Sequence, residues 1–214
     1  MAYFIQQTLV FCIPLMIVAL AGVFAERSGI INIALEGIMV FGAFIGVLFV
    51  RMFLEMGFSP ENGQLMLIIV LIITMIFGGL FALLLAFASI SLKADQTIGG
   101  TALNLLAPAI VLFLIVIISQ QNVLTINSRY SAVDLFMLNQ EDFGFGPKLT
   151  NPLGFVGDVL FNKVWLTTWY SIIIYVVLSI ILYKTKFGLR LRACGEHPQA
   201  ADSVGSNVYN MRYI

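Results

Sequence analysis

Five apolar stretches, each close to the length needed to cross a bilayer, constrain the fold of this chain more than any other feature. They run from about residue 9 to 25, 37 to 50, 65 to 92, 101 to 119 and 164 to 183. A helix needs roughly 20 residues to span the hydrocarbon core. Of the 214 residues, 60% are hydrophobic and 10% charged, whereas soluble domains have about 25% charged residues. We therefore expect an all-α, polytopic transmembrane helical bundle with at least five spans, forming one domain over residues 1–214.

Two patterns inside these stretches predict local geometry. Pro14 lies within the first stretch, where a proline removes a helix hydrogen bond and favours a kink. Gly42 and Gly46 form a GxxxG pattern in the second stretch, and small residues at this spacing let two helices approach closely. The second stretch is short for a span unless part of the polar segment before it also lies at membrane depth.

The distribution of Lys and Arg predicts the orientation of the chain in the membrane. Short cytoplasmic loops carry an excess of these residues, and Lys184, Lys186, Arg190 and Arg192 directly follow the fifth stretch. Counting spans back from that loop places the N-terminus outside. Seven of the 11 Lys and Arg residues then lie inside and four outside.

The same topology assigns the loops. Residues 120–163 become an external loop, with an interfacial helix predicted near residues 153–161, and residues 184–207 become a cytoplasmic loop. Residues 208–214 mix apolar and polar side chains in the manner of a helix entry. We therefore expect the bundle to continue beyond residue 214.

A polar segment, residues 26–37, separates the first two apolar stretches. Charges beside a bilayer are costly and need partners, water or a function. Asn32 and Glu36 are four residues apart, so on a helix they share one face, and Ser28 or Gly29 is suited to break the helix. Because broken helices at membrane depth often line solute sites, the segment predicts a pathway or gate lined by Asn32 and Glu36.

A second polar interruption precedes and enters the fourth stretch. Asp95 or Thr97 is suited to cap a helix start, and two glycines follow. Thr101 and Asn104 share a helix face at a spacing of three. Pro108 has no N–H to bond the carbonyl of Asn104, which leaves that oxygen available. The pattern is again that of a polar lining.

The third constellation is the basic loop at residues 187–205. Pro198 is placed as the first residue of a short helix and Gly205 as its stop. The small side chains of Ala200 and Ala201 are suited to dock into a groove on a partner. A short helix in a cytoplasmic loop is what a motor subunit would push against.

Each motif has a structural alternative that spacing alone does not exclude. The first is a tight turn in which Glu26 or Glu36 pairs with Arg27 to hold two helices. The second is a kinked helix with Asn104 hydrogen-bonded to a neighbouring span. The third is an ordinary basic loop at a span end.

Several kinds of chemistry lack the residues they need. His197 is the only histidine, and the sequence contains no Walker A, HExxH or CxxC pattern, so we expect no metal, no cofactor and no ATP hydrolysis by this chain. Its formal net charge is zero, which gives no argument for nucleic acid. Cys12 lies in an apolar stretch and Cys194 in the basic loop, and we expect two free thiols.

Three segments together resemble a known family. Residues 26–29 with 32–37, the Gly-Thr-Ala-Leu-Asn-Leu-Leu run at 100–106, and the loop at 185–205 are similar to the permease subunits of bacterial ABC importers for nucleosides and simple sugars. These are relatives of the ribose and branched-chain amino acid permeases. The chain departs from the family pattern at His197, where Asn is expected, at Cys194, where a small aliphatic is expected, and in its shorter length.

The resemblance implies a mechanism and partners. Two permease subunits, often different, form an alternating-access path in the bacterial cytoplasmic membrane; a separate ATPase docks on the cytoplasmic loops, and an extracytoplasmic binding protein delivers solute. Nucleosides are the first expectation and simple sugars the second; an ion-coupled secondary transporter and a non-transporting scaffold are the rival classes. The pathway or structural positions implied are Asn32, Glu36, Thr101 and Asn104. The ATPase-coupling positions implied are Gly188, Arg190, Arg192, Gly195, Glu196, Pro198, Ala200, Ala201 and Gly205.

Overall fold

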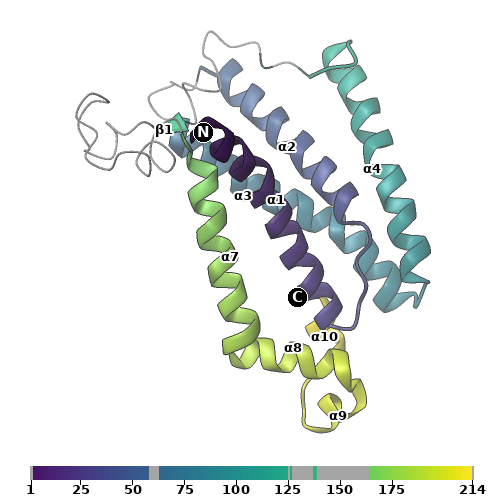
Figure 1. Ribbon diagram of the computed structural model, residues 1–214. Coiled ribbons are helices and arrows are strands. Elements are labelled where there is room, and N and C mark those ends of the chain that lie inside the picture. Colours follow the sequence, from purple (N-terminus) through teal and green to yellow (C-terminus); the bar gives the residue numbers. More distant parts are fainter. Residues whose placement is uncertain (1, 58–62, 125, 127–136, 139–163, 214) are drawn as a thin grey trace, which may run out of the picture.

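Five long helices make up most of the computed structural model, which describes residues 2–57, 63–124, 126, 137–138 and 164–213. They alternate in direction along the bundle (Figure 1), and each is long and apolar enough to cross a membrane. The all-α, multi-span fold is therefore confirmed. The five helices are α1 Ala2–Arg27, α2 Leu35–Glu55, α3 Gly63–Ala86, α4 Gln96–Ser119 and α7 Leu166–Lys184.

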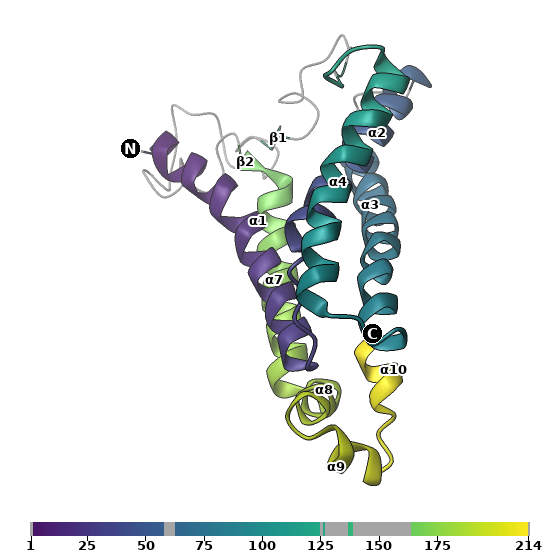
Figure 2. The same cartoon turned by 90° about the vertical axis from the view of Figure 1, so that its right-hand side faces the viewer.

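Short elements lie at both ends of the bundle. A π-helical turn, η2 (Phe87–Ser91), extends α3, and α8 (Lys186–Glu196) runs across the same end of the bundle (Figure 1). α9 (Pro198–Ser203) lies below it, and α10 (Val208–Tyr213) turns back up toward the bundle (Figure 2). At the opposite end, β1 (Met137–Leu138) pairs antiparallel with β2 (Val164–Trp165).

The long helices form two packed groups. One is the helix triad α2, α3 and α4, and the other is the helix pair α1 and α7; Figure 2 shows the pair standing apart from the triad along much of its length. Within the triad, Ala34, Phe81 and Leu103 belong to one buried cluster, and the rings of Phe41 and Phe81 stack with centroids 4.6 Å apart. Burial of such apolar surface and close ring packing stabilise the triad as one body.

The two groups also meet at their ends. Near β2, Trp165 and Tyr170 of the α7 region pack against a cluster that includes Val50 and Met66 of the triad. At the other end, the hydroxyl of Ser91 in η2 shares hydrogen bonds with Tyr209 (2.7 Å) and Tyr213 (2.5 Å) of α10. The helix pair and the triad are thus tied at both ends, and the space between them lies toward the α8–α10 end.

Small residues permit the closest contacts inside the triad. A Cβ added to Gly42 or to Gly46 would lie 3.5 Å from the side chain of Thr74 on α3, which is the close approach that the GxxxG pattern predicts. At the start of α2, a Cβ on Gly37 would lie 2.9 Å from the carbonyl oxygen of Leu103 on α4. A Cβ on Gly100 would lie 2.9 Å from the Cβ of Ile33. The α2–α4 contact therefore has no room for larger side chains.

Three predicted span boundaries were wrong. The first span begins at Ala2 and not near residue 9. The second span is not 37–50 but extends to Glu55, because Arg51 and Glu55 neutralise each other across one helical turn at 2.7 Å. The fourth begins at Gln96, earlier than the glycines, because Asp95 caps it. Pro14 does not end α1, and the interfacial helix expected near residues 153–161 lies outside the described residues.

Substituting alanine at Gly37 tests the α2–α4 contact. The new methyl group meets the Leu103 carbonyl at 2.9 Å and Asn104 Oδ1 at 3.0 Å, so Gly37→Ala is expected to destabilise the chain by about 1–3 kcal/mol through overpacking. Gly78→Ala is the control, since nothing lies within 4 Å of its added Cβ and alanine gains up to about 1 kcal/mol in a helix. Thermal unfolding in detergent micelles should show a lower Tm for the first variant only; equal Tm values would contradict this packing.

Candidate functional site

The chain leaves the helical conformation directly after α1. The amide of Ser28 bonds back to Phe24 (3.1 Å) and Ala25 (3.0 Å), and the amide of Ile30 also reaches the Ala25 carbonyl (3.1 Å). Gly29 stands between them with a φ of +86°, a left-handed conformation that glycine adopts without steric cost. The predicted helix break at Ser28 and Gly29 is therefore confirmed, and residues 28–34, here called the linker segment, run without helix until α2 begins.

Asn32 and Glu36 do not share a helix face, because Asn32 lies in the linker segment and Glu36 in the first turn of α2. The Asn32 side chain instead accepts a hydrogen bond from the amide of Ala34 at 3.0 Å, a local turn that competes with helix. Glu36 is exposed. The described residues form no ion pair between Arg27 and either Glu26 or Glu36; the pair they do form is Arg51–Glu55.

Asn104 ties the linker segment and the start of α2 to α4. Its Oδ1 accepts from the amide of Gly37 at 2.8 Å, and its Nδ2 donates to the carbonyl of Ile33 at 2.8 Å. About two turns earlier on α4 lies Gln96, whose Oε1 accepts from the amide of Ile31 at 2.7 Å. These side chains pair three backbone groups that the non-helical segment leaves without helical partners, as a membrane protein requires.

Thr101 plays a different part from Asn104, although the two were predicted to line one face. The Thr101 hydroxyl donates to the carbonyls of Thr97 (2.9 Å) and Ile98 (3.0 Å) on its own helix, and the residue is exposed. The predicted cap of α4 is confirmed as Asp95, which accepts from the amides of Ile98 and Thr97. These two backbone hydrogen bonds hold the pKa of the Asp95 carboxyl below its usual value.

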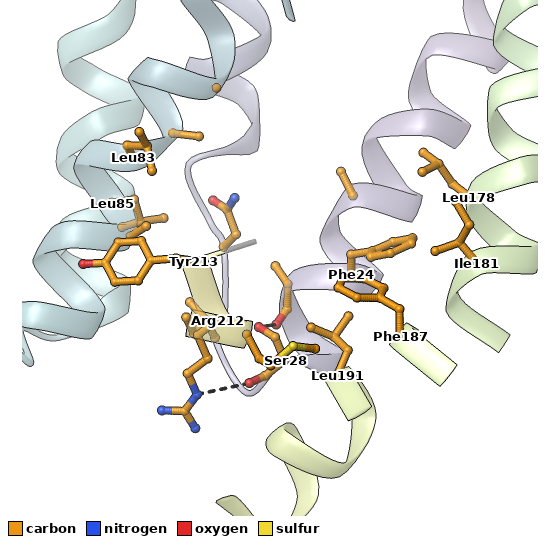
Figure 3. Close-up of a pocket in the computed structure, with 18 residues that line it drawn as sticks. Phe24, Ser28, Leu83, Leu85, Leu178, Ile181, Phe187, Leu191, Arg212 and Tyr213 are labelled. Carbon is orange, nitrogen blue, oxygen red and sulfur yellow. Dashed lines mark hydrogen bonds between the residues drawn. The ribbon is translucent and has the colours of Figure 1, made fainter. Parts of the chain in front are cut away.

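A cavity of about 630 Å³ opens between the helix pair and the triad near the α8–α10 end. Figure 3 shows its two walls: Leu83 and Leu85 of α3 lie on one side, and Phe24 of α1 with Ile181 of α7 lies on the other. The lining is mainly apolar. Its polar members are Ser28, Asn32, Arg212 and Tyr213. Of the four predicted pathway residues, Asn32 alone lines this cavity, and the structure does not bring Glu36, Thr101 and Asn104 to it.

α8 is fastened tightly to the end of α7. Thr185 caps α8 by accepting from the amide of Gly188 at 3.3 Å and donates to the Ile181 carbonyl at 2.5 Å. A Cβ on Gly188 would collide with the Leu182 carbonyl oxygen, so glycine is required for this turn. Arg192 bonds back to the Gly188 carbonyl at 3.3 Å and places its guanidinium 5.7 Å from the Tyr183 ring centre. Gly188 and Arg192 therefore set the angle between α7 and α8.

Gly195 places α8 directly against the end of α1. A Cβ on Gly195 would collide with the Arg27 carbonyl oxygen and lie 3.0 Å from the amide nitrogen of Gly29. Close by, Arg212 of α10 donates from Nε to the carbonyl of Ser28 at 3.3 Å (Figure 3). Backbone therefore meets backbone at Gly195, with no side chain between.

α8 and α9 enclose a groove of about 470 Å³. Pro198 is the first residue of α9 and Gly205, with a φ of +86°, follows its end, so both predicted boundaries of the short helix are confirmed. Leu189 and Val204 line the groove with 62% and 85% of their surfaces exposed. The other lining residues are Arg190, Ala193, Glu196, His197, Ala200, Ala201 and Ser206. Ala200 is exposed, but Ala201 is buried, so the two alanines do not form one free face.

Sequence reasoning found most of the glycines and polar residues at these contacts but missed their partners. Gln96, Arg212, Leu189 and Val204 were not singled out. Gln96 follows a capping residue and Arg212 lies 184 positions from Ser28, so no local pattern marks either one. Leu189 and Val204 could have been found from the sequence, because both are large apolar residues in a loop outside the predicted spans.

Replacing Asn104 by leucine tests whether this residue is a structural bridge. The substitution leaves the Gly37 amide and the Ile33 carbonyl without the partner each now has, which costs about 1–3 kcal/mol for each buried unpaired group. Thr101→Val is the matched control, because the Thr101 hydroxyl bonds only carbonyls of its own helix. Hydrogen exchange read by mass spectrometry should accelerate at Gly37 in Asn104→Leu and not in the control. Unchanged protection at Gly37 would show that the bridge contributes nothing.

Known proteins similar to this chain are membrane permeases. It is 39% identical over 210 residues to the guanosine ABC transporter permease protein NupQ of Bacillus subtilis, covering 98% of this chain and 61% of that protein. It is 35% identical over 209 residues to the nucleoside ABC transporter permease protein NupC of Lactococcus lactis, with the same coverage. A putative glucose ABC transporter permease, TsgC13 of Haloferax volcanii, is 26% identical over 94% of the chain and 54% of its own length.

The chain thus spans about three-fifths of the length of the curated relatives it matches. No solved structure matches it. The family profile described as branched-chain amino acid transport system / permease component matches residues 4–214. Because that match covers nearly the whole sequence and the five apolar helices agree with it, the chain belongs to this family of multi-pass membrane permease components.

Proposed function

We propose that this chain is the membrane-spanning permease subunit of an ATP-driven ABC importer that carries nucleosides by alternating access. The names of two relatives support this solute class: NupQ is a guanosine permease at 39% identity, and NupC is a nucleoside permease at 35%. The geometric observation that carries the proposal is the α8–α9 groove. It offers apolar surface beyond the ends of the spans, where a motor subunit has access to it.

The ATPase docks on this groove. Leu189 and Val204 are among the exposed large apolar residues, and they lie outside the membrane-spanning helices. Exposed apolar surface in contact with water marks an interaction site. Arg190 and Glu196 also line the groove and add one charge of each sign, which fixes the orientation of a docked partner. The other predicted coupling residues, Gly188, Gly195, Pro198 and Gly205, shape the elements that carry it.

The remaining parts of the importer follow from this assignment. ATP hydrolysis belongs to a separate ATPase subunit, and an extracytoplasmic solute-binding protein delivers the nucleoside. A second permease subunit, different in sequence, completes the translocation path. The membrane is the bacterial cytoplasmic membrane, with the α8–α10 end inside. Lys184 ends α7 and is followed closely by Lys186, Arg190 and Arg192, the excess of positive charge that is typical of cytoplasmic loops.

Among the proposed pathway residues, Asn32 has the best-placed side chain because it lines the cavity between the helix pair and the triad. Glu36 and Thr101 are exposed and stay candidates for a path formed with the second permease subunit. Asn104 contributes by holding the backbone around them, since both ends of its amide are engaged. A simple sugar is the second candidate solute, because the relative TsgC13 is named as a putative glucose permease.

Uptake by the reconstituted importer tests the proposal. Proteoliposomes with the permease subunits, the ATPase and the solute-binding protein should accumulate labelled guanosine or uridine only when ATP is supplied, and an excess of leucine should not compete. Labelled ribose or glucose in place of the nucleoside tests the second candidate. Uptake that survives without ATP and collapses with the proton or sodium gradient would assign the chain to secondary transporters instead.

Placing a charge in the groove tests the docking site. Val204→Asp should reduce co-purification of the ATPase at least about tenfold, as expected for a central apolar contact. Gln199→Asp is the control, since Gln199 is exposed on α9, the helix that Val204 directly follows, but does not line the groove. Equal co-purification of the two variants would remove the groove from the interface. Because the ATPase is cytoplasmic, loss of docking also fixes the side of the membrane on which α8 and α9 lie.

A further inference from the structure

The linker segment, residues 28–34, is held from two sides by parts of the chain that lie far apart in sequence. On one side, Gly195 of α8 meets the backbone of Arg27 and Gly29, and Arg212 of α10 donates to the Ser28 carbonyl at 3.3 Å. Of these two elements, α8 also lines the α8–α9 groove. Any displacement of α8 must therefore displace the first residues of the linker segment or break these contacts.

On the other side, the linker segment is held by α4. Gln96 accepts from the Ile31 amide at 2.7 Å, and Asn104 bridges the Ile33 carbonyl and the Gly37 amide, both at 2.8 Å. Gly100 lies between these two side chains and packs against Ile33 and Ala34 without room for a methyl group. Ala34 is fully buried, so this side of the segment moves with the helix triad.

We propose that the linker segment is a mechanical relay that carries the movement of α8 and α9 to α2 and α4, with Gly195 and Asn104 as the positioning residues at its two ends. The inference rests on the proposed function, in which the ATPase moves α8 and α9. It adds a route by which that movement reaches the triad, with which α7 shares few contacts.

The geometry suits such a relay in three respects. The contact at Gly195 is made by backbone atoms, so no flexible side chain absorbs a displacement. Beyond Ser28, whose amide still bonds the Phe24 carbonyl, the segment is non-helical, and element-terminal loop residues are those that absorb φ/ψ changes in hinge motions. At its far end the two-point grip of Asn104 fixes α2 relative to α4, so the pair responds as one body.

α10 provides a separate link to the third helix of the triad. Tyr209 and Tyr213 both bond Ser91 in η2, at the end of α3. This link bypasses the linker segment, so changes in the segment are expected to affect α2 and α4 and to leave the attachment of α3 in place. Exchange at the amides beside Ser91 therefore serves as an internal reference.

A first experiment tests the mechanical link without any partner. The full chain in lipid nanodiscs is compared with Gly195→Ala, whose methyl group must push the Arg27 carbonyl away. Hydrogen exchange at the Gly37 amide should rise about fivefold, corresponding to one weakened hydrogen bond, while exchange near Ser91 stays unchanged. Gln199→Ala is the control on α9. Unchanged exchange at Gly37 in Gly195→Ala overturns the relay, whatever the importer transports.

A second experiment tests the relay in the working importer through the nucleoside moved per ATP hydrolysed. Gly195→Ala and Asn104→Ala should each lower that ratio about tenfold, a typical coupling energy between sites, with ATPase docking and hydrolysis retained. The double variant Gly195→Ala/Asn104→Ala should move no less nucleoside per ATP than the more impaired single variant, because both substitutions interrupt the same route. Gly78→Ala combined with Gly195→Ala should lower the ratio no further than Gly195→Ala alone, because nothing lies within 4 Å of the methyl group that Gly78→Ala adds. If the two losses in nucleoside moved per ATP multiply in the double variant, or if Gly195→Ala no longer binds the ATPase, the proposed relay is wrong.

Milder variants keep the test decisive where the first ones fail to insert. Arg212→Met and Gln96→Met each remove one side-chain hydrogen bond to the linker segment, from opposite sides. The Arg212→Met/Gln96→Met double variant should lose no more nucleoside moved per ATP than the more impaired of the two single variants. A larger loss in the double variant would contradict the relay. If the unmodified importer shows no ATP-driven nucleoside uptake, the proposed function fails, and the exchange response at Gly37 still decides the mechanical link.

Discussion

The need to pair every backbone polar group near the bilayer controls this structure. Where α1 ends, seven residues run without helix before α2, and several of their amides and carbonyls find partners on distant elements. Gln96, Asn104 and Arg212 supply three of the side chains that do so, from α4 and α10. The helix break therefore determines which helices are neighbours: α4 must lie beside α2, and α10 must fold back beneath α1.

This constraint also explains the distribution of glycines. Gly37 and Gly100 let the linker segment and α2 approach α4 closely enough for Asn104 to reach both of its partners. Gly188 and Gly195 do the same for α8 against α7 and α1. Hydrogen bonds across helices are short only where backbones come close, so the polar bridges and the small residues depend on each other.

Much of this could be predicted from the sequence, and what could not be predicted has physical reasons. Apolar length gave the five spans, and capping chemistry gave Asp95, Pro198 and the break at Gly29, because these signals are local. The helical relation between Asn32 and Glu36 was wrong because Asn32 bonds its own backbone instead of continuing a helix. The hydrogen-bond partners of Ser28, Ile31 and Ile33 come from distant segments of the chain. No local sequence pattern shows which distant segments fold together.

The apolar groove between α8 and α9 has a consequence for how the cell handles this subunit. Val204, with 85% of its surface exposed, and Leu189, with 62% exposed, lie outside the five apolar helices. Quality-control proteases and chaperones recognise such unsheltered patches, so an orphan copy would be short-lived in the cell. Under the proposed function, the amount of this subunit in the cell would then follow the amount of the ATPase that covers the groove.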